Sequence, residues 1–264
     1  MRILSGTSAF GKEATLLYRA IRYRRGFGVH SPFVFDLITK VIEEECPYYR
    51  FNEIELLRKQ LLGKEEQITY PDRRGKGKLK NRTIGAVVKR EAIRPKQGAL
   101  LFRLANYFKS KNILQVGTTT GISTLYLTSY ASGLRCVALE NIPAFSTIIQ
   151  QAFAKLARNP IDLRIGNYAD IFPKALEEMG NIDFLFFNTP YESDSNRQWI
   201  RESLRYVHDH SVLVIEGINA NVCMRTFWEE IKASPKVSVT LDLFSLGIVL
   251  FDKRLHKKNY IVNF

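Results

Sequence analysis

The chain has 264 residues, 45% of them hydrophobic, a size that suits one large domain or an ordinary domain with an appendage. No apolar run reaches the length of about 18 residues that a transmembrane helix needs, and residues 1–28 lack the apolar core of a secretory signal. The three cysteines have no metal-like spacing, which fits a reducing compartment. We therefore expect a cytoplasmic protein without membrane association or a disulfide framework.

Residues 1–95 are predicted to form an N-terminal helical extension, or lid, that ends in a basic linker. A first helix with a basic face covers Thr15–Arg25. Ser31 is a suitable N-cap, and Pro32 suits the first position of a second helix that runs to about Glu45. His30 precedes this helix and could be a base or a substrate contact on a lid, or could simply orient the turn.

The most polar part of the chain is Tyr70–Arg94, the basic segment, which follows a predicted third helix capped by Asn52 and ending at Gly63. The formal net charge is +13, and such a surface favours polyanions through phosphate contacts. The basic segment could be a phosphate-binding strap that contacts nucleic acid, a mobile lid, or a solvated linker. Its basic residues include Arg73, Arg74, Lys76, Lys78, Lys80, Arg82, Lys89 and Arg90.

From Lys96 onward, apolar runs of strand length alternate with helical patterns, which indicates a parallel sheet covered on both faces. The last two runs are close enough to form an antiparallel hairpin. The expected fold is α/β, with a Rossmann-like, seven-stranded, mostly parallel sheet and a C-terminal hairpin, preceded by the N-terminal helices. The predicted strands are 113–116, 135–139, 161–165, 182–187, 211–215, 237–241 and 246–251.

A glycine turn follows the first of these strands. The strand stops at Gly117, and a helical pattern begins after Gly121. Glycine allows positive φ and close approach of a ligand to the backbone, and a helix start offers free N–H groups. The turn could bind a nucleotide-like ligand or be an ordinary tight connection.

Glu140 ends the second predicted strand, where an acid can accept both hydroxyl groups of a ribose. A solvent-exposed loop carboxylate is the alternative. The turn between Gly117 and Gly121 lacks the full pattern of a diphosphate binder. It therefore suits a ligand with ribose and adenine but no diphosphate, such as S-adenosylmethionine (SAM).

Several segments resemble class I SAM-dependent methyltransferases, most closely the catechol-type small-molecule O-methyltransferases. Leu114–Ser123, read Leu-Gln-Val-Gly-Thr-Thr-Thr-Gly-Ile-Ser, is similar to their first motif. Val137–Asn141 is similar to their ribose-binding motif, and Ile182–Asn188 resembles their fourth-strand motif. The resemblance covers about Ala99–Phe251. Gly28–Phe33 also looks like a segment of uncharacterised bacterial methyltransferases.

The resemblance implies SAM as cofactor and a methyltransferase domain over residues 96–264. Residues of the glycine turn would line the methionine and ribose side, and Glu140 would bind the ribose hydroxyls. Asn167 and Tyr168 would flank the adenine, and Asn188 would sit near the sulfonium. The implied cofactor-binding residues are Gln115, Gly117, Thr118, Thr119, Gly121, Ser123, Glu140, Asn141, Asn167, Tyr168 and Asn188.

The chain departs from the family at the metal and base positions. The metal-dependent members carry acids at the ends of the fourth and fifth strands, where this chain has Asn188 and Glu216-Gly217. Mg²⁺ prefers several carboxylate oxygens, so we expect no catalytic metal. Gln115 stands where the family usually has Glu, and Tyr191 stands about where some relatives have a lysine base.

Three functions stay open. The first is a metal-independent O-methyltransferase for a small or medium substrate, with Glu216, Tyr191 and His30 as candidate bases. The second is a degenerate methyltransferase fold that binds SAM or a nucleoside without turnover. The third is an RNA- or amino-group-directed methyltransferase, because Asn188–Tyr191 partly resembles an amino-methylation motif and the basic segment suits RNA. A homodimer stays open as well.

Overall fold

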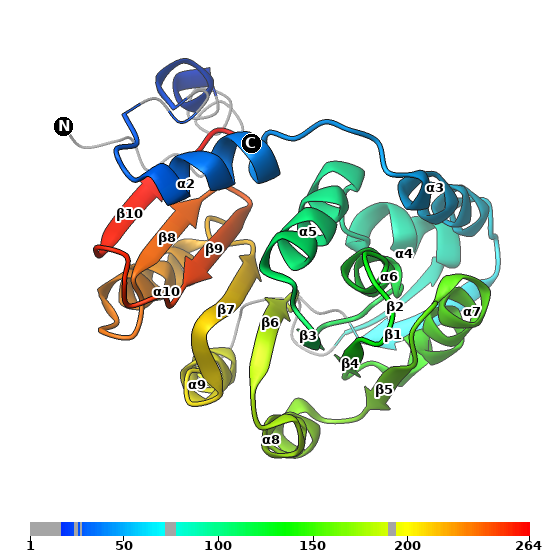
Figure 1. Cartoon of the computed structure of the whole chain (residues 1–264). Helices are drawn as coiled ribbons and strands as arrows, with labels where there is room; N and C mark the ends of the chain where they lie inside the picture. Colours follow the sequence, from blue (N-terminus) through cyan, green and yellow to red (C-terminus); the bar gives the residue numbers. More distant parts are fainter. Residues whose placement is uncertain (1–16, 24–25, 27, 72–77, 190–193) are drawn as a thin grey trace.

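A computed structural model describes residues 17–23, 26, 28–71, 78–189 and 194–264 (Figure 1). Tyr191 and the predicted phosphate contacts Arg73, Arg74 and Lys76 lie outside these residues. The described residues form a central eight-stranded sheet with the order β10-β8-β9-β7-β6-β3-β4-β5. Its strands are β3 (Asn112–Val116), β4 (Arg135–Glu140), β5 (Ile161–Ile165), β6 (Ile182–Phe187), β7 (Val207–Glu216), β8 (Val239–Asp242), β9 (Leu246–Leu250) and β10 (Lys258–Ile261).

The predicted mostly parallel sheet with a closing antiparallel hairpin is confirmed, but its strand number is eight rather than seven. Strands β3 to β7 are parallel to their neighbours in this group, and β8 and β9 form the hairpin. The additional strand is β10, which pairs in parallel with β8 at the outer edge. Lys258–Ile261 is short and mostly exposed, so it lacks the apolar run by which the inner strands are recognised.

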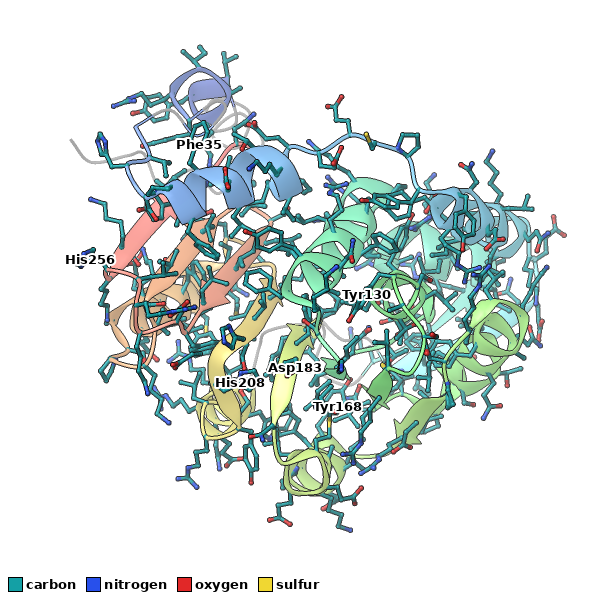
Figure 2. The ribbon with its side chains drawn as sticks, in the orientation of Figure 1. Phe35, Tyr130, Tyr168, Asp183, His208 and His256 are labelled. Atoms are coloured by element: carbon teal, nitrogen blue, oxygen red, sulfur yellow. The ribbon has the colours of Figure 1, made fainter. Side chains whose placement is uncertain are left out.

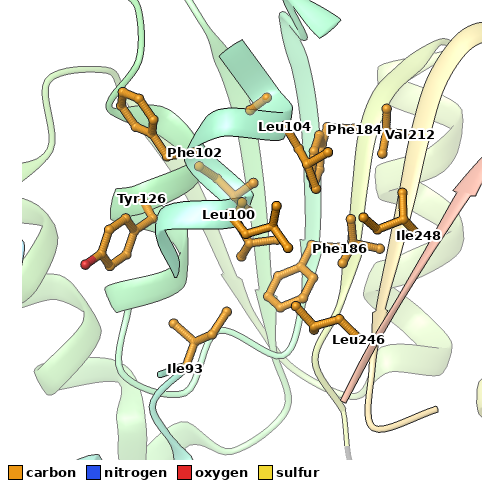
Figure 3. Close-up of a cluster of buried hydrophobic side chains, with 14 of the residues drawn as sticks. Ile93, Leu100, Phe102, Leu104, Tyr126, Phe184, Phe186, Val212, Leu246 and Ile248 are labelled. Carbon is orange, nitrogen blue, oxygen red and sulfur yellow. The ribbon is translucent and has the colours of Figure 1, made fainter. Parts of the chain in front are cut away.

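Helices cover both faces of this sheet. This is required because successive side chains of β6 are apolar and point to opposite faces. Phe184 and Phe186 face one layer (Figure 3), and Leu185 and Phe187 face the other. The first layer contains α2 (Pro32–Leu37), η1 (Ile38–Ile42), α3 (Tyr49–Leu62), α5 (Pro95–Phe108), α6 (Ile122–Thr128) and α7 (Ser146–Leu156), and the second contains α8 (Tyr168–Met179), α9 (Asp194–Ser203) and α10 (Val222–Ala233). None of the described helices combines the length and the apolar character needed to cross a membrane.

The N-terminal helices pack into the same core as the sheet. Ser31 caps α2 as predicted, with its hydroxyl accepting from the amide of Val34 at 3.4 Å. Val34 and Leu37 share a buried cluster with Leu100 of α5. The predicted start of the third helix at Asn52 is wrong, because α3 begins at Tyr49. The division of the chain at residue 95 stays a prediction.

The basic segment is more ordered than a linker in its described parts. It contains strand β2 (Leu79–Thr83), which pairs antiparallel with β1 (Gln67–Pro71), and helix α4 (Ile84–Glu91). Tyr70 is 3% exposed and its ring lies 5.0 Å from that of Phe145, just beyond β4. An aromatic partner far along the sequence, Phe145, therefore holds this segment in place. The polar composition of the segment does not predict this contact.

The three cysteines should differ sharply in reactivity. Cys136 is buried in β4, and burial raises the pKa of its thiol to about 12, whereas Cys46 and Cys223 are exposed. We expect Ellman's reagent to modify two thiols in the native protein and the third only after unfolding. Cys136→Ala should leave the two native reactions unchanged. Reaction of all three native thiols at similar rates would contradict the buried position.

Candidate functional site

The candidate site lies at the carboxyl ends of the parallel strands, where the strand order reverses. From β3 the chain passes to β4 and β5 on one side of the sheet, and then returns to β6 and β7 on the other. β3 and β6 are neighbours, and the amide of Asn188 donates to the carbonyl oxygen of Val116 at 2.8 Å. Such a reversal is where open α/β sheets bind ligands.

Gly117 begins the turn after β3 at this point. Its φ is +87°, and a Cβ placed on it would lie 1.9 Å from the carbonyl oxygen of Asn188. Only glycine fits here, because the conformation and the space both exclude a side chain. Thr119 and Gly121 also have positive φ, at +54° and +76°. The turn is thus held in a left-handed path directly against the end of β6.

Gln115 supports this turn from inside the protein. It is fully buried, and its Nε2 donates to the Gly117 carbonyl oxygen at 3.2 Å and to Ser123 Oγ at 2.7 Å. Its Oε1 accepts from Thr124 Oγ1 at 2.9 Å. A glutamate could not donate to the Gly117 carbonyl. The amide therefore ties the turn to the start of α6, and Gln115 and Ser123 contact each other.

Glu140 joins the same turn from the end of β4. Its Oε2 accepts from the amide of Thr119 at 2.7 Å, and its Oε1 accepts from the amides of Asn141 and Ile142 at 3.0 Å each. The side chain is fully buried, so the alternative of an exposed loop carboxylate is excluded. Three backbone donors that converge on the carboxylate hold it in one position beside the turn.

Thr189 belongs to this site, although the sequence did not single it out. It is 4% exposed and follows Asn188 at the end of β6. Its Cγ2 lies 3.2 Å from the position of a Cβ on Gly117. Its buried Oγ1 has no hydrogen-bond partner among the described residues. A buried hydroxyl without a partner is costly, which suits a position that a polar ligand group completes.

The residues predicted around the adenine are placed less uniformly. Asn167 is exposed and caps α8, with its Oδ1 accepting from the amide of Ala169 at 3.1 Å. Tyr168 is 4% exposed and its ring lies 5.4 Å from that of Trp199, in the layer of α8 and α9. Asn141 is exposed beside Glu140. Asn167 and Asn141 therefore face solvent at this edge, whereas Tyr168 packs in the core.

The three candidate bases do not come together. Glu216 ends β7, at the same edge of the sheet as Gly117 and Glu140. His30 lines a cavity with Val239, the first residue of β8, and therefore lies at the opposite edge. Tyr191 lies outside the described residues. Among the described residues, no group of three or more His, Cys, Asp or Glu side chains is arranged to hold a metal ion.

No family model matches the sequence. A catechol O-methyltransferase from Niastella koreensis is 25% identical over 130 residues, which are 48% of this chain and 58% of that protein. The chain therefore spans little more than half the length of this relative.

Solved structures are similar over most of the chain. An O-methyltransferase from Bacillus cereus in complex with SAH has a TM-score of 0.55 at 19% identity, over 83% of this chain and 97% of that one. The O-methyltransferase TomG from Streptomyces achromogenes, in complex with SAM, has a TM-score of 0.55 at 16% identity, over 78% of this chain and 91% of that one. An SAH-bound methyltransferase from Podospora anserina has a TM-score of 0.57 at 14% identity, over 95% of this chain and 99% of that one. This chain shares the α/β fold of these proteins.

Three of the sequence motifs end at the same edge of the sheet in this fold. The turn at Gly117, the acid at Glu140 and the strand end at Asn188 occupy adjacent strands β3, β4 and β6. These motifs are separated by many residues along the chain, and the order of the strands brings them to one edge. The fold therefore places these three motif positions side by side.

Proposed function

We propose that this protein is a SAM-dependent methyltransferase that transfers a methyl group to oxygen on a small or medium substrate without a catalytic metal. The carrying observation is the buried carboxylate of Glu140, held 2.7 Å from the amide nitrogen of Thr119 in the glycine turn. A carboxylate fixed beside such a turn has the chemistry to accept ribose hydroxyls. The relative named catechol O-methyltransferase supports a small-molecule substrate.

The donor set at this edge fits an adenosine-containing cofactor. Glu140 would bind the ribose, and the strained turn from Gly117 to Gly121 would let the cofactor approach the backbone. The unpartnered hydroxyl of Thr189 would donate to or accept from the methionine part of the cofactor. Asn141 and Asn167, both exposed, would face the adenine side.

Binding in this arrangement requires movement of the elements that cover the edge. Thr119 and Glu140 are at most 1% exposed. Hairpin β1–β2 and helix α4 pack on the loop after Glu140, with Tyr70 and Val87 clustered against Phe145. We propose that these elements separate from the loop to admit the cofactor.

SAM supplies an electrophilic methyl group when bound, and the chain has to position an acceptor in line with it. Glu216 is the candidate base at this edge, since it ends β7, the strand next to β6. Its carboxylate would take the proton of the acceptor hydroxyl as the oxygen attacks. His30 lies at the opposite edge of the sheet and has no role in this proposal.

Binding without turnover is the second candidate. Gln115 stands where the resembling family has Glu. Its amide makes its hydrogen bonds inside the protein, with Gly117, Ser123 and Thr124. A site of this kind can hold a cofactor without supplying charge to the reaction. The RNA-directed function, the homodimer and the cytoplasmic location stay predictions.

Calorimetric titration with S-adenosylhomocysteine tests the cofactor site directly. We expect one site per chain with micromolar affinity, and the same result after treatment with EDTA. No heat of binding at millimolar ligand would overturn the cofactor assignment. Transfer of labelled methyl from SAM to catechol or a panel of small phenols would then separate an enzyme from a binding protein.

A further inference from the structure

A second candidate site lies far from the glycine turn, in a cavity of about 580 Å³. It opens between residues 28–33, before and at the start of α2, and the amino ends of β8 and β10. Val239 and Lys258, the first residues of these strands, pair with each other and both line the cavity. Because β8 runs parallel to β7, this is the edge opposite to Glu216 and Glu140.

The walls of the cavity are cationic. Among the described residues, its lining includes no Asp or Glu, and it includes five basic or imidazole side chains, His30, Arg254, His256, Lys257 and Lys258. A cavity lined by one sign of charge concentrates ligands of the opposite sign. Figure 2 shows His256 on the outer edge of the molecule beside β10.

Two of these cations already have partners. The guanidinium of Arg254 pairs with Asp252 at 2.7 Å. The ammonium of Lys257 donates to the carbonyl oxygens of Ala233 and Ser234, at the end of α10, at 3.1 and 2.7 Å. Lys257 therefore keeps its positive charge at the rim, whereas the carboxylate of Asp252 offsets the charge of Arg254.

The other three are available to a ligand. The side chains of His30, His256 and Lys258 have no hydrogen-bond or ion-pair partner among the described residues, and all three are exposed. Nearby, Phe33 and Tyr260 supply aromatic surface to the same cavity. The cavity thus combines unpaired basic and imidazole side chains with an apolar wall, and its volume is within the usual range for small-molecule sites.

We propose that this cavity binds a small organic anion, a molecule with an apolar or aromatic body and one acidic group such as a carboxylate, sulfonate or phosphate. The acidic group contacts Lys258 and His256, and the body packs on Tyr260 and Phe33. The site is separate from the proposed cofactor edge, and it depends on β10, the strand that exceeds the expected seven.

Anilinonaphthalene sulfonate is a suitable probe. N-phenylnaphthylamine, which has the same aromatic rings but no charged group, is its control. We expect the sulfonate to bind the full chain in the presence of saturating S-adenosylhomocysteine, and to bind at least tenfold more tightly than the uncharged probe. Displacement of the sulfonate by S-adenosylhomocysteine, or equal binding of both probes, would overturn the proposal.

Lys258→Gln and His256→Gln locate the site. Each should weaken sulfonate binding, by about tenfold for Lys258, because a charge-assisted hydrogen bond is lost. Lys253→Gln is the matched control, since Lys253 is on the same loop, its side chain is 86% exposed, and it does not line the cavity. Unchanged binding in both test variants, or an equal loss in the control, would overturn the assignment. Melting curves confirm that each variant is folded.

Discussion

Gly117→Ala is expected to abolish binding of S-adenosylhomocysteine and to lower the free energy of unfolding by roughly 2–4 kcal/mol. The new Cβ would lie 1.9 Å from the carbonyl oxygen of Asn188, and a contact with backbone cannot be relieved by a side-chain rotation. The φ of +87° adds a second penalty for any residue with a Cβ. Urea unfolding and calorimetric titration measure the two effects.

Gly133→Ala is the matched control for this variant. Gly133 has a φ of +73°, but no atom lies within 4 Å of the position of its Cβ. It therefore isolates the conformational penalty, about 1 kcal/mol, from the collision with β6. Equal loss of stability in the two variants would show that the close approach of Gly117 to Asn188 has no energetic role.

Glu140→Gln is expected to weaken binding of S-adenosylhomocysteine by about a hundredfold and to destabilise the fold by roughly 2–3 kcal/mol. The amide has nearly the same shape, but its NH₂ group cannot accept a hydrogen bond. It would face an amide donor of Thr119, or those of Asn141 and Ile142, all of which now donate to the carboxylate. The cofactor would also lose a charged acceptor for its ribose hydroxyls.

An exposed carboxylate provides the comparison. Glu229 of α10 pairs with Lys232 and its side chain is 69% exposed, so Glu229→Gln should change neither stability nor binding measurably. If Glu140→Gln loses stability but binds the ligand with unchanged affinity, the carboxylate is a structural support of the turn and not a cofactor contact. The proposed ribose role would then be wrong.

The parts of the site that follow from local rules were predictable. The sequence places glycines at 117 and 121, and both adopt positive φ as a strand-to-helix turn requires. Glu140 was identified because it ends an apolar run of strand length that follows the glycine turn. Ser31 caps α2 because a hydroxyl before a proline-led helix satisfies a backbone amide.

The parts that depend on distant partners were not predictable. Thr189 lies in the segment Asn188–Tyr191 that partly resembles an amino-methylation motif, but its place beside Gly117 and its buried hydroxyl without a partner come from the structure. His30 was considered for the catalytic edge, but the packing of α2 places it in the opposite cavity. Gln115 looked like a weakened cofactor contact, and its hydrogen bonds instead tie the turn to α6.

The sequence by itself therefore determined the alternation of strands and helices, the doubly covered sheet and the glycine turn. These features follow from the spacing of apolar residues along the chain and from the backbone conformations that glycine allows. Both depend only on residues close together in the sequence. Only the tertiary structure decided the eighth strand at Lys258–Ile261, the hairpin β1–β2 held by Tyr70 on Phe145, and the cationic cavity at the far edge. Their stability comes from partners remote along the chain, which a local pattern does not contain.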